Sequence, residues 1–310
     1  PYTTLFRSPL EKKRQTFYKE GMTNRYLPPH ISPRQVVARL GLISDTHMPD
    51  RWPDLPETLP QIFRGVDLIL HAGDVGELWV LDQLSAIAPV VAVHGNDEPP
   101  ATPEQLPHKQ LITLAGQRML VWHGHFADRV DEMESRRDQS LRPKLERIAR
   151  HGQRVGAKLV HFGHWHIPLV CELEGVTLVN AGALASGNLT TRQVVQTAAI
   201  VYVLKNGRFH ITHINLADGR IHQPPDVAAS DFAAAARPYQ ASILSPEVEG
   251  AIRPFAGNPA LLQLLWRAAP RCWWGGAPVL TRADLLAELP HIPSTPHQAA
   301  LLAALQPGEV

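Results

Sequence analysis

Six short apolar runs in the chain each end at side chains that can bind a metal ion. They end at Asp45-Thr46-His47, Gly73-Asp74, Gly95-Asn96-Asp97, His123-Gly124-His125, Gly163-His164-Trp165-His166 and Asn180. Nitrogen and oxygen donors without cysteine suit borderline ions such as Mn²⁺, Fe²⁺ or Zn²⁺ better than Ca²⁺. Two such ions can clamp both the attacking and the leaving oxygen of an in-line displacement, so hydrolysis of phosphate esters is the chemistry that this pattern indicates.

The apolar runs are typical of strands buried in an α/β sheet, because such strands are continuously apolar and ligands bind beyond their carboxyl ends. From Leu40 to about Leu216 the pattern alternates strands with helical segments, among them residues 55–64 and 77–86. On an extended backbone, residues two apart project to the same side. We therefore expect the acid and histidine of Asp45-Thr46-His47 to share a side, and likewise the two histidines of His164-Trp165-His166.

The ends of the chain differ in composition from its middle. Residues 1–35 are polar with little periodicity and are predicted to be a tail, residues 36–225 the main domain, and residues 226–310 a helical extension rich in Ala, Pro and Leu. Residues 1–8 resemble the translation of a sequencing adapter and are excluded from the fold argument, which leaves Met22 as one possible start. In the extension, we expect Trp273-Trp274-Gly275-Gly276 to pack in a core and regard a recognition patch as the alternative.

Charge and cysteine content limit the classes of partner. Lys and Arg number 30 against 29 Asp and Glu, so the net charge of +1 gives no bulk electrostatic case for nucleic acid or membrane binding. The two cysteines form no CxxC motif and favour a reducing, cytoplasmic location, although a single disulfide stays open. No apolar stretch approaches the roughly 20 residues that span a bilayer, and no signal-peptide core is evident. A soluble protein is expected, with homo-oligomerisation left open.

In their order and position, the DxH, GD, GN, HGH and GHxH motifs resemble those of the calcineurin-like metallophosphoesterase superfamily. The short spacings, and Asn-Ala-Gly at residues 180–182 where relatives carry Asn-Pro-Gly, are most similar to its small bacterial and archaeal phosphodiesterases. The resemblance covers residues 40–216. It implies an α/β fold, a four-layer α/β/β/α sandwich, to which the C-terminal helical extension is added.

The resemblance also implies how the ligands divide between two divalent ions. One ion would be held by Asp45, His47, Asp74 and His166, and the second by Asp74, Asn96, His123 and His164, so that Asp74 bridges. Seven donor residues exceed what a mononuclear zinc hydrolase needs. Mn²⁺ is the metal that the family favours, with Fe²⁺ and Zn²⁺ as alternatives. His125 follows the family ligand by two residues and is either a catalytic candidate behind the ligands or a packing residue of the loop.

The implied reaction is attack on phosphorus by a hydroxide that bridges the two ions. Two divalent ions bring about +4, two aspartates subtract 2 and the hydroxide 1, so a net charge of about +1 attracts a phosphoryl group. The predicted function is a phosphodiesterase acting on small-molecule phosphate esters. Asn96 is a candidate catalytic residue as well as a ligand.

One position departs from the family pattern. Many relatives carry His directly after the Asn, where it protonates the leaving oxygen, but here Asn96 is followed by Asp97 and Glu98. Asp97 can act as the general acid only if its pKa rises well above about 3.9, and two nearby cations favour the opposite. We therefore expect a preference for substrates with good leaving groups, such as aryl phosphodiesters.

Two alternatives remain beside this function. A non-catalytic scaffold is one, because the retromer subunit of the same fold has lost ligands and works through its surface. A nucleotide or dinucleoside polyphosphate hydrolase is another, whereas nuclease action is disfavoured by the near-neutral charge.

The arginines of residues 128–150 could guide phosphates, but a solvated helix face is the favoured interpretation. No G-x-S-x-G, Walker or dinucleotide motif occurs.

Overall fold

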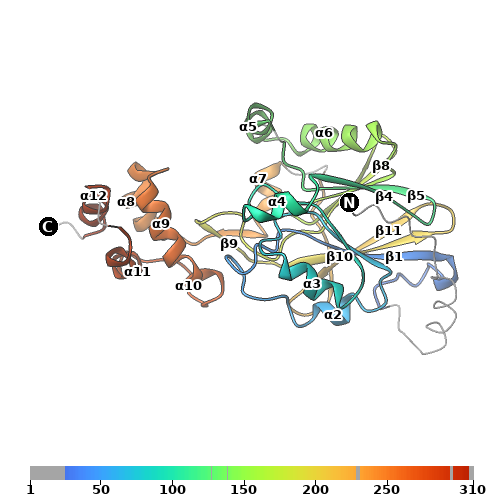
Figure 1. Cartoon of the computed structure of the whole chain (residues 1–310), viewed down its shortest axis with the longest axis horizontal. Coiled ribbons are helices and arrows are strands. Elements are labelled where there is room, and N and C mark those ends of the chain that lie inside the picture. The colour runs from blue at the N-terminus through green and yellow to red at the C-terminus, as the bar shows by residue number, and fades with distance from the viewer. Residues whose placement is uncertain (1–24, 127, 138, 228–230, 294–295, 307–310) are drawn as a thin grey trace.

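The computed structural model describes residues 25–126, 128–137, 139–227, 231–293 and 296–306. Most of the predicted tail, including Pro1 to Ser8 and Met22, lies outside these residues. The described residues form a layered α/β body, and a group of C-terminal helices lies to one side of it (Figure 1).

The first sheet contains the ends of three predicted runs. In the described part of the chain its strand order is β12-β11-β10-β1-β2-β3. The strands are β1 (Val36–Ile43), β2 (Leu68–His71), β3 (Val90–Ala92), β10 (Thr197–Leu204), β11 (Phe209–Asn215) and β12 (Ile221–His222). Because β1, β2 and β3 run parallel, their carboxyl ends meet at one edge. The motifs of Asp45, Asp74 and Asn96 follow these ends.

The second sheet contains the ends of the other runs. Its order over the described residues is β4-β5-β6-β8-β7, with β5, β6 and β8 parallel. The strands are β4 (Lys109–Leu114), β5 (Gln117–Trp122), β6 (Leu159–Phe162), β7 (Leu169–Leu173) and β8 (Val176–Asn180). His123 follows β5 and His164 follows β6. A small pair, β9 (Thr191–Gln193) with β13 (Gln240–Ser242), lies apart from both sheets.

The two sheets pack face to face, and helices cover their outer faces. Leu40 and Leu70 of the first sheet share a buried cluster with Met119 and Val179 of the second. On the outer face of the first sheet, α2 (Leu59–Ile62) and α3 (Trp79–Ser85) pack on β1, β2 and β10. On the outer face of the second sheet, α6 (Leu141–Arg154) packs on β5, β6 and β8, as Figure 1 shows. The four-layer α/β/β/α fold is thereby confirmed.

Two helices of the main body are shorter than their sequence patterns predict. The segment 55–64 yields only α2, and 77–86 only α3. The charged stretch 128–150 holds α5 (Arg129–Arg137) and most of α6, and α6 is the amphipathic helix that the spacing of Leu141, Leu145 and Ile148 indicates. The remaining helices of this part are η1 (Pro33–Gln35), α4 (Ala101–Gln105) and α7 (Phe232–Ala236).

The C-terminal helices have a hydrophobic core of their own. They are α8 (Pro246–Ile252), η2 (Arg253–Phe255), α9 (Pro259–Ala268), α10 (Pro270–Trp273), α11 (Arg282–Glu288), η3 (Leu289–His291) and α12 (Pro296–Leu305). Leu189, from the loop before β9, packs against this core. Trp273 is buried and its indole N–H donates to the Thr191 carbonyl at 2.9 Å, whereas Trp274 is 40% exposed. Within the described residues, no helix is both long and apolar enough to cross a membrane.

Candidate metal centre

The backbone at the predicted ligands adopts an unusual conformation. Left-handed φ angles occur at Asp45 (54°), His47 (45°), Asp74 (51°), His164 (70°) and His166 (58°). Such angles cost non-glycine residues on the order of 1–3 kcal/mol each and cluster at functional sites. The extended backbone predicted for Asp45–His47 and His164–His166 is therefore wrong. Each segment is a tight turn beyond a strand end, and the turn, not the pleat, aims its side chains.

Hydrogen bonds between neighbouring strand ends hold these turns. The Asp45 amide donates to the Gly73 carbonyl at 2.9 Å, and the His47 amide donates to the Asp74 carbonyl at 3.0 Å. Asn180 fastens the third turn, because its side-chain amide donates to the Gly163 carbonyl at 2.8 Å. Asn180 is thus a support of the loop that carries His164.

Glycine is required where the turns approach each other. A Cβ added at Gly95 would lie 2.0 Å from Asp74 Oδ1, and one at Gly73 would lie 2.9 Å from the His123 ring. Gly73 also has a φ of +88°. Any side chain at either position would push Asp74 or His123 away, which explains the glycines of the GD and GN motifs.

Four of the predicted ligands form one compact cluster, here called the first ligand group. Asp45, His47, Asp74 and His166 are buried, and one potential ligand atom from each lies within 4.8 Å of the other three. His166 Nε2 is 3.1 Å from Asp45 Oδ1, and His47 Nε2 is 3.4 Å from Asp74 Oδ2. The cluster joins turns that are far apart in the sequence.

The donor chemistry of the first ligand group fits a divalent cation. His47 Nε2 is buried and makes no hydrogen bond among the described residues, although it faces the Asp74 carboxylate. Burial lowers the pKa of His47 to about 3, so its imidazole is neutral and able to act as a ligand. Burial opposes ionisation of Asp45, but His166 outweighs it and lowers the pKa of that carboxyl to about 2. Two carboxylates and two imidazole rings are a suitable donor set.

The second ligand group consists of Asp74, Asn96, His123 and His164. His123 Nε2 is 3.2 Å from Asp74 Oδ2 and 3.1 Å from Asn96 Oδ1. Burial disfavours a charged His123, but Asp74 outweighs this effect and raises the pKa of His123 to about 9. Asp74 therefore contacts histidines of both groups, as a bridging ligand would.

The ring of His164 contacts a side chain outside the second ligand group. Its backbone N–H donates to Asp45 Oδ1 at 3.1 Å, and its ring centroid is 5.1 Å from that of His123. However, His164 Nε2 lies 3.1 Å from Glu132 Oε1. The other oxygen of Glu132 accepts a hydrogen bond from the Phe126 amide at 3.0 Å. Glu132, on α5, is a site residue that no motif in the sequence indicated.

Asp97 and Glu98 are both held by other groups. Asp97 accepts a hydrogen bond from Arg51, whose side chain is buried and also donates to the Ser186 carbonyl at 3.0 Å. Glu98 accepts from the amides of Val75, Gly76 and Gly95 at 2.8–3.0 Å. An ion-paired carboxylate accepts hydrogen bonds and has no proton to give, so this geometry does not support Asp97 as the general acid.

His125 lies in a group of histidine rings beside the second ligand group. Its ring centroid is 4.8 Å from that of His108 and 5.3 Å from that of His123. Burial, together with the neighbouring histidines, lowers the pKa of His125 to about 3. It is therefore neutral at physiological pH, which suits packing or hydrogen bonding better than proton donation.

A cavity of about 260 Å³, here called the tryptophan cavity, opens at the first ligand group. Its lining includes His47, Arg51, Asp97 and, from α9 of the C-terminal helices, Trp266. The Arg51 guanidinium lies 5.4 Å from the centre of the Trp266 ring. The C-terminal helices therefore form part of the wall beside a predicted metal ligand. Neither Arg51 nor Trp266 carried a sequence signal, because their contact joins residues 215 positions apart.

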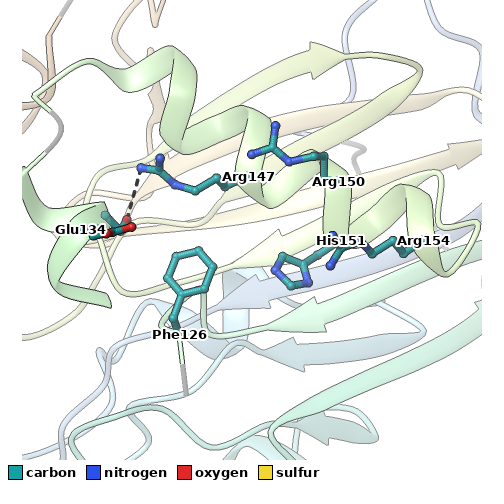
Figure 2. A pocket seen from close by; sticks show the side chains of 7 residues that line it. Phe126, Glu134, Arg147, Arg150, His151 and Arg154 are labelled. Carbon is teal, nitrogen blue, oxygen red and sulfur yellow. Dashed lines mark hydrogen bonds between the residues drawn. The ribbon is translucent and has the colours of Figure 1, made fainter. Parts of the chain in front are cut away.

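A second cavity of about 300 Å³, here called the arginine cavity, lies between α5, α6 and Phe126. Figure 2 shows Arg147, Arg150, His151 and Arg154 extending from one helix, with the Phe126 ring across from them. Arg147 and Arg150, two of the arginines expected to form a solvated face, thus line a concave surface.

Comparison with known proteins gives matches over the layered body. A sequence model of the calcineurin-like phosphoesterase superfamily domain matches residues 39–223. A probable metallophosphoesterase of Methanothermobacter thermautotrophicus is 35% identical over 156 residues, which are 50% of this chain and 83% of the relative. A probable metallophosphoesterase of Methanocaldococcus jannaschii is 35% identical over 144 residues, or 46% of this chain and 67% of the relative. The crystal structure of zinc-bound Vps29 from Entamoeba histolytica has a TM-score of 0.47 at 20% identity, covering 63% of this chain and 99% of that one.

Proposed function

Because the chain belongs to the calcineurin-like phosphoesterase superfamily, we propose that it is a phosphodiesterase that depends on two divalent metal ions. One observation carries the proposal. Asp74 lies between two sets of imidazole, carboxylate and amide donors, 3.4 Å from His47 on one side and 3.2 Å from His123 on the other. A single carboxylate shared in this way is the expected bridge of a dinuclear site.

The two ligand groups would hold one ion each, with Asp74 common to both. When bound, the ions would supply positive charge to the phosphoryl oxygens and lower the pKa of a water molecule. Mn²⁺ is the first choice, and Fe²⁺ and Zn²⁺ suit the same nitrogen and oxygen donors.

The chain orients the proposed ligands through the second nitrogen of their rings. His166 Nδ1 donates to the Ala185 carbonyl at 2.9 Å, and His123 Nδ1 donates to the Ala72 carbonyl at 2.8 Å. Such bonds fix the tautomer and leave Nε2 directed at the site, an arrangement typical of metal-binding histidines. In both residues Nε2 is also the atom nearest an aspartate, which supports their assignment as ligands.

The same residues suggest which esters are turned over well. Asp97 is paired with Arg51, and burial lowers the pKa of His125 to about 3, so neither is a ready proton donor for the leaving oxygen. Substrates whose leaving group needs no proton should react fastest. We expect bis-p-nitrophenyl phosphate to be hydrolysed in preference to p-nitrophenyl phosphate, and a clear monoester preference would contradict this expectation.

Substitution of one ligand tests the function itself. His123→Ala should abolish hydrolysis of bis-p-nitrophenyl phosphate by the Mn²⁺-loaded protein while the circular dichroism spectrum stays that of the wild type. His291→Ala, at an exposed histidine of η3, is the matched control and should keep full activity. Loss of fold together with activity in His123→Ala would instead favour a structural metal.

A further inference from the structure

The arginine cavity has a lining suited to anions. Arg147, Arg150, His151 and Arg154 follow one another at helical spacing and so share one face of α6. Within the described residues, Glu134 is the one acidic side chain of the lining. With His151 neutral, the lining therefore carries a formal charge of about +2.

Neither Arg150 nor Arg154 is neutralised by a residue that the structure describes. Among the described residues, neither makes an ion pair, whereas Arg142 on the same helix pairs with Glu146 at 3.0 Å. Lys109 adds a further cation, because its Nζ is 3.2 Å from His151 Nδ1. Like charges gathered around one hollow repel each other, and an anion bound there would relieve the repulsion.

Short contacts connect the arginine cavity to the second ligand group. The ring centroid of His151 is 4.5 Å from that of Trp122, the residue before His123. Phe126 lines the cavity, and its amide donates to the same Glu132 carboxylate that contacts His164. Trp122 and Glu132 thus link the wall of the cavity to two proposed metal ligands, His123 and His164.

The chemistry of the lining specifies the kind of anion. Guanidinium groups bind phosphate through paired, charge-assisted hydrogen bonds, and the two exposed arginines can turn toward a guest. A molecule with one phosphoryl group at the metal centre and another in the arginine cavity must carry at least two phosphates. We propose that the arginine cavity binds a second phosphate group of the substrate, so that the enzyme acts on polyphosphorylated esters of the nucleotide type. This inference rests on the proposed function for the identity of the reacting group.

Inorganic pyrophosphate is a direct probe of this cavity. Its affinity for the full-length protein would be measured by isothermal titration calorimetry in the wild type and in the Arg150→Ala/Arg154→Ala double variant. We expect saturable binding by the wild type and at least a tenfold weaker affinity in the double variant, because two donors of charge-assisted hydrogen bonds are lost. Affinity in the wild type should also fall as salt is added.

Two controls separate this cavity from the metal centre. Arg142→Ala/Arg208→Ala removes the same charge from exposed positions outside the cavity and should leave affinity within about twofold. His47→Ala alters the first ligand group and should leave pyrophosphate binding at the cavity detectable. Circular dichroism would verify the fold of each variant.

The outcomes distinguish the two proposals. Absence of pyrophosphate binding by the wild type, or equal affinities in the wild type and the cavity variant, would overturn the phosphate subsite. So would binding that is lost in His47→Ala but kept in Arg150→Ala/Arg154→Ala. The phosphodiesterase proposal fails separately, if the wild type with Mn²⁺ does not hydrolyse bis-p-nitrophenyl phosphate.

Discussion

The two ligand groups differ in how completely the fold assembles them. The first is gathered at strand ends, with a ligand atom of every member within 4.8 Å of the others. The second has Asp74, Asn96 and His123 in contact, but His164 is also engaged by Glu132 from α5. The strand-end turns therefore assemble one half of the proposed centre by themselves, whereas the other half also has a contact from a helix outside the sheets.

This contrast explains where strain is located. The residues of the first group all have left-handed φ angles, whereas among the members peculiar to the second group only His164 does. Strain at a functional site persists when the surrounding structure determines it, and here the hydrogen bonds between neighbouring turns provide that support. Of the two proposed ions, the one in the first ligand group should therefore bind more tightly.

Asp74→Asn should have the largest effect, because it weakens both groups at once. We expect hydrolysis of bis-p-nitrophenyl phosphate to fall by more than the roughly 100-fold that loss of an outer-shell partner can cost. Steady-state kinetics at saturating Mn²⁺ would measure the decrease. A variant that retains a tenth of the activity would show that Asp74 is not shared.

Replacement of one histidine in each ligand group should distinguish the affinities for the two proposed ions. His47→Ala should lower the affinity for the tightly bound ion, whereas His164→Ala should lower only that for the weaker ion, each by at least about tenfold. Titration with Mn²⁺, followed by electron paramagnetic resonance of the free ion, would resolve the two steps. Equal effects of both substitutions on the first step would contradict an ordered pair of sites.

Glu132→Gln tests the helix-dependent half with a smaller change. Removal of a negative charge beside His164 should weaken the second ion by about tenfold and leave the first unchanged, because the carboxylate favours a nearby cation. The same Mn²⁺ titration measures it, with Glu134→Gln on the same helix as control. Tighter binding of the second ion would mean that Glu132 competes with the metal for His164.

Trp266→Ala should have the smallest effect. Stacking of Trp266 on Arg51 is worth roughly 0.5–1 kcal/mol, so we expect a two- to fivefold change in KM for bis-p-nitrophenyl phosphate with kcat nearly constant. Trp274→Ala, at an equally exposed tryptophan that does not line the cavity, should leave KM unchanged. Identical kinetics of both variants would show that the C-terminal helices do not contribute to substrate binding.

The sequence was sufficient to predict the features that depend on local patterns of residues. The superfamily and the α/β/β/α layers followed from motifs at the ends of apolar runs, and both are confirmed. The order of motifs along the chain also indicated which residues would meet, since parallel strands bring their carboxyl ends together. The assignment of each ligand to an ion, the identity of the metal and the diester preference stay predictions.

What the sequence did not predict depends on long-range packing. Glu132 contacts His164 from α5, a helix outside both sheets, and Trp266 lies against Arg51 although it belongs to the C-terminal helices, which pack on the loop before β9. No spacing rule connects such pairs. The left-handed turns were also missed, because alternation along a strand gives no information about the residues just beyond its end.

The number of metal ions bound per chain tests the central claim most directly. Elemental analysis of the full-length protein after equilibration with Mn²⁺ and removal of free ion should give two ions per chain for the wild type and fewer than one for Asp74→Asn. A wild type that binds one ion or none, or an Asp74→Asn variant that still binds two, would contradict the shared-carboxylate centre.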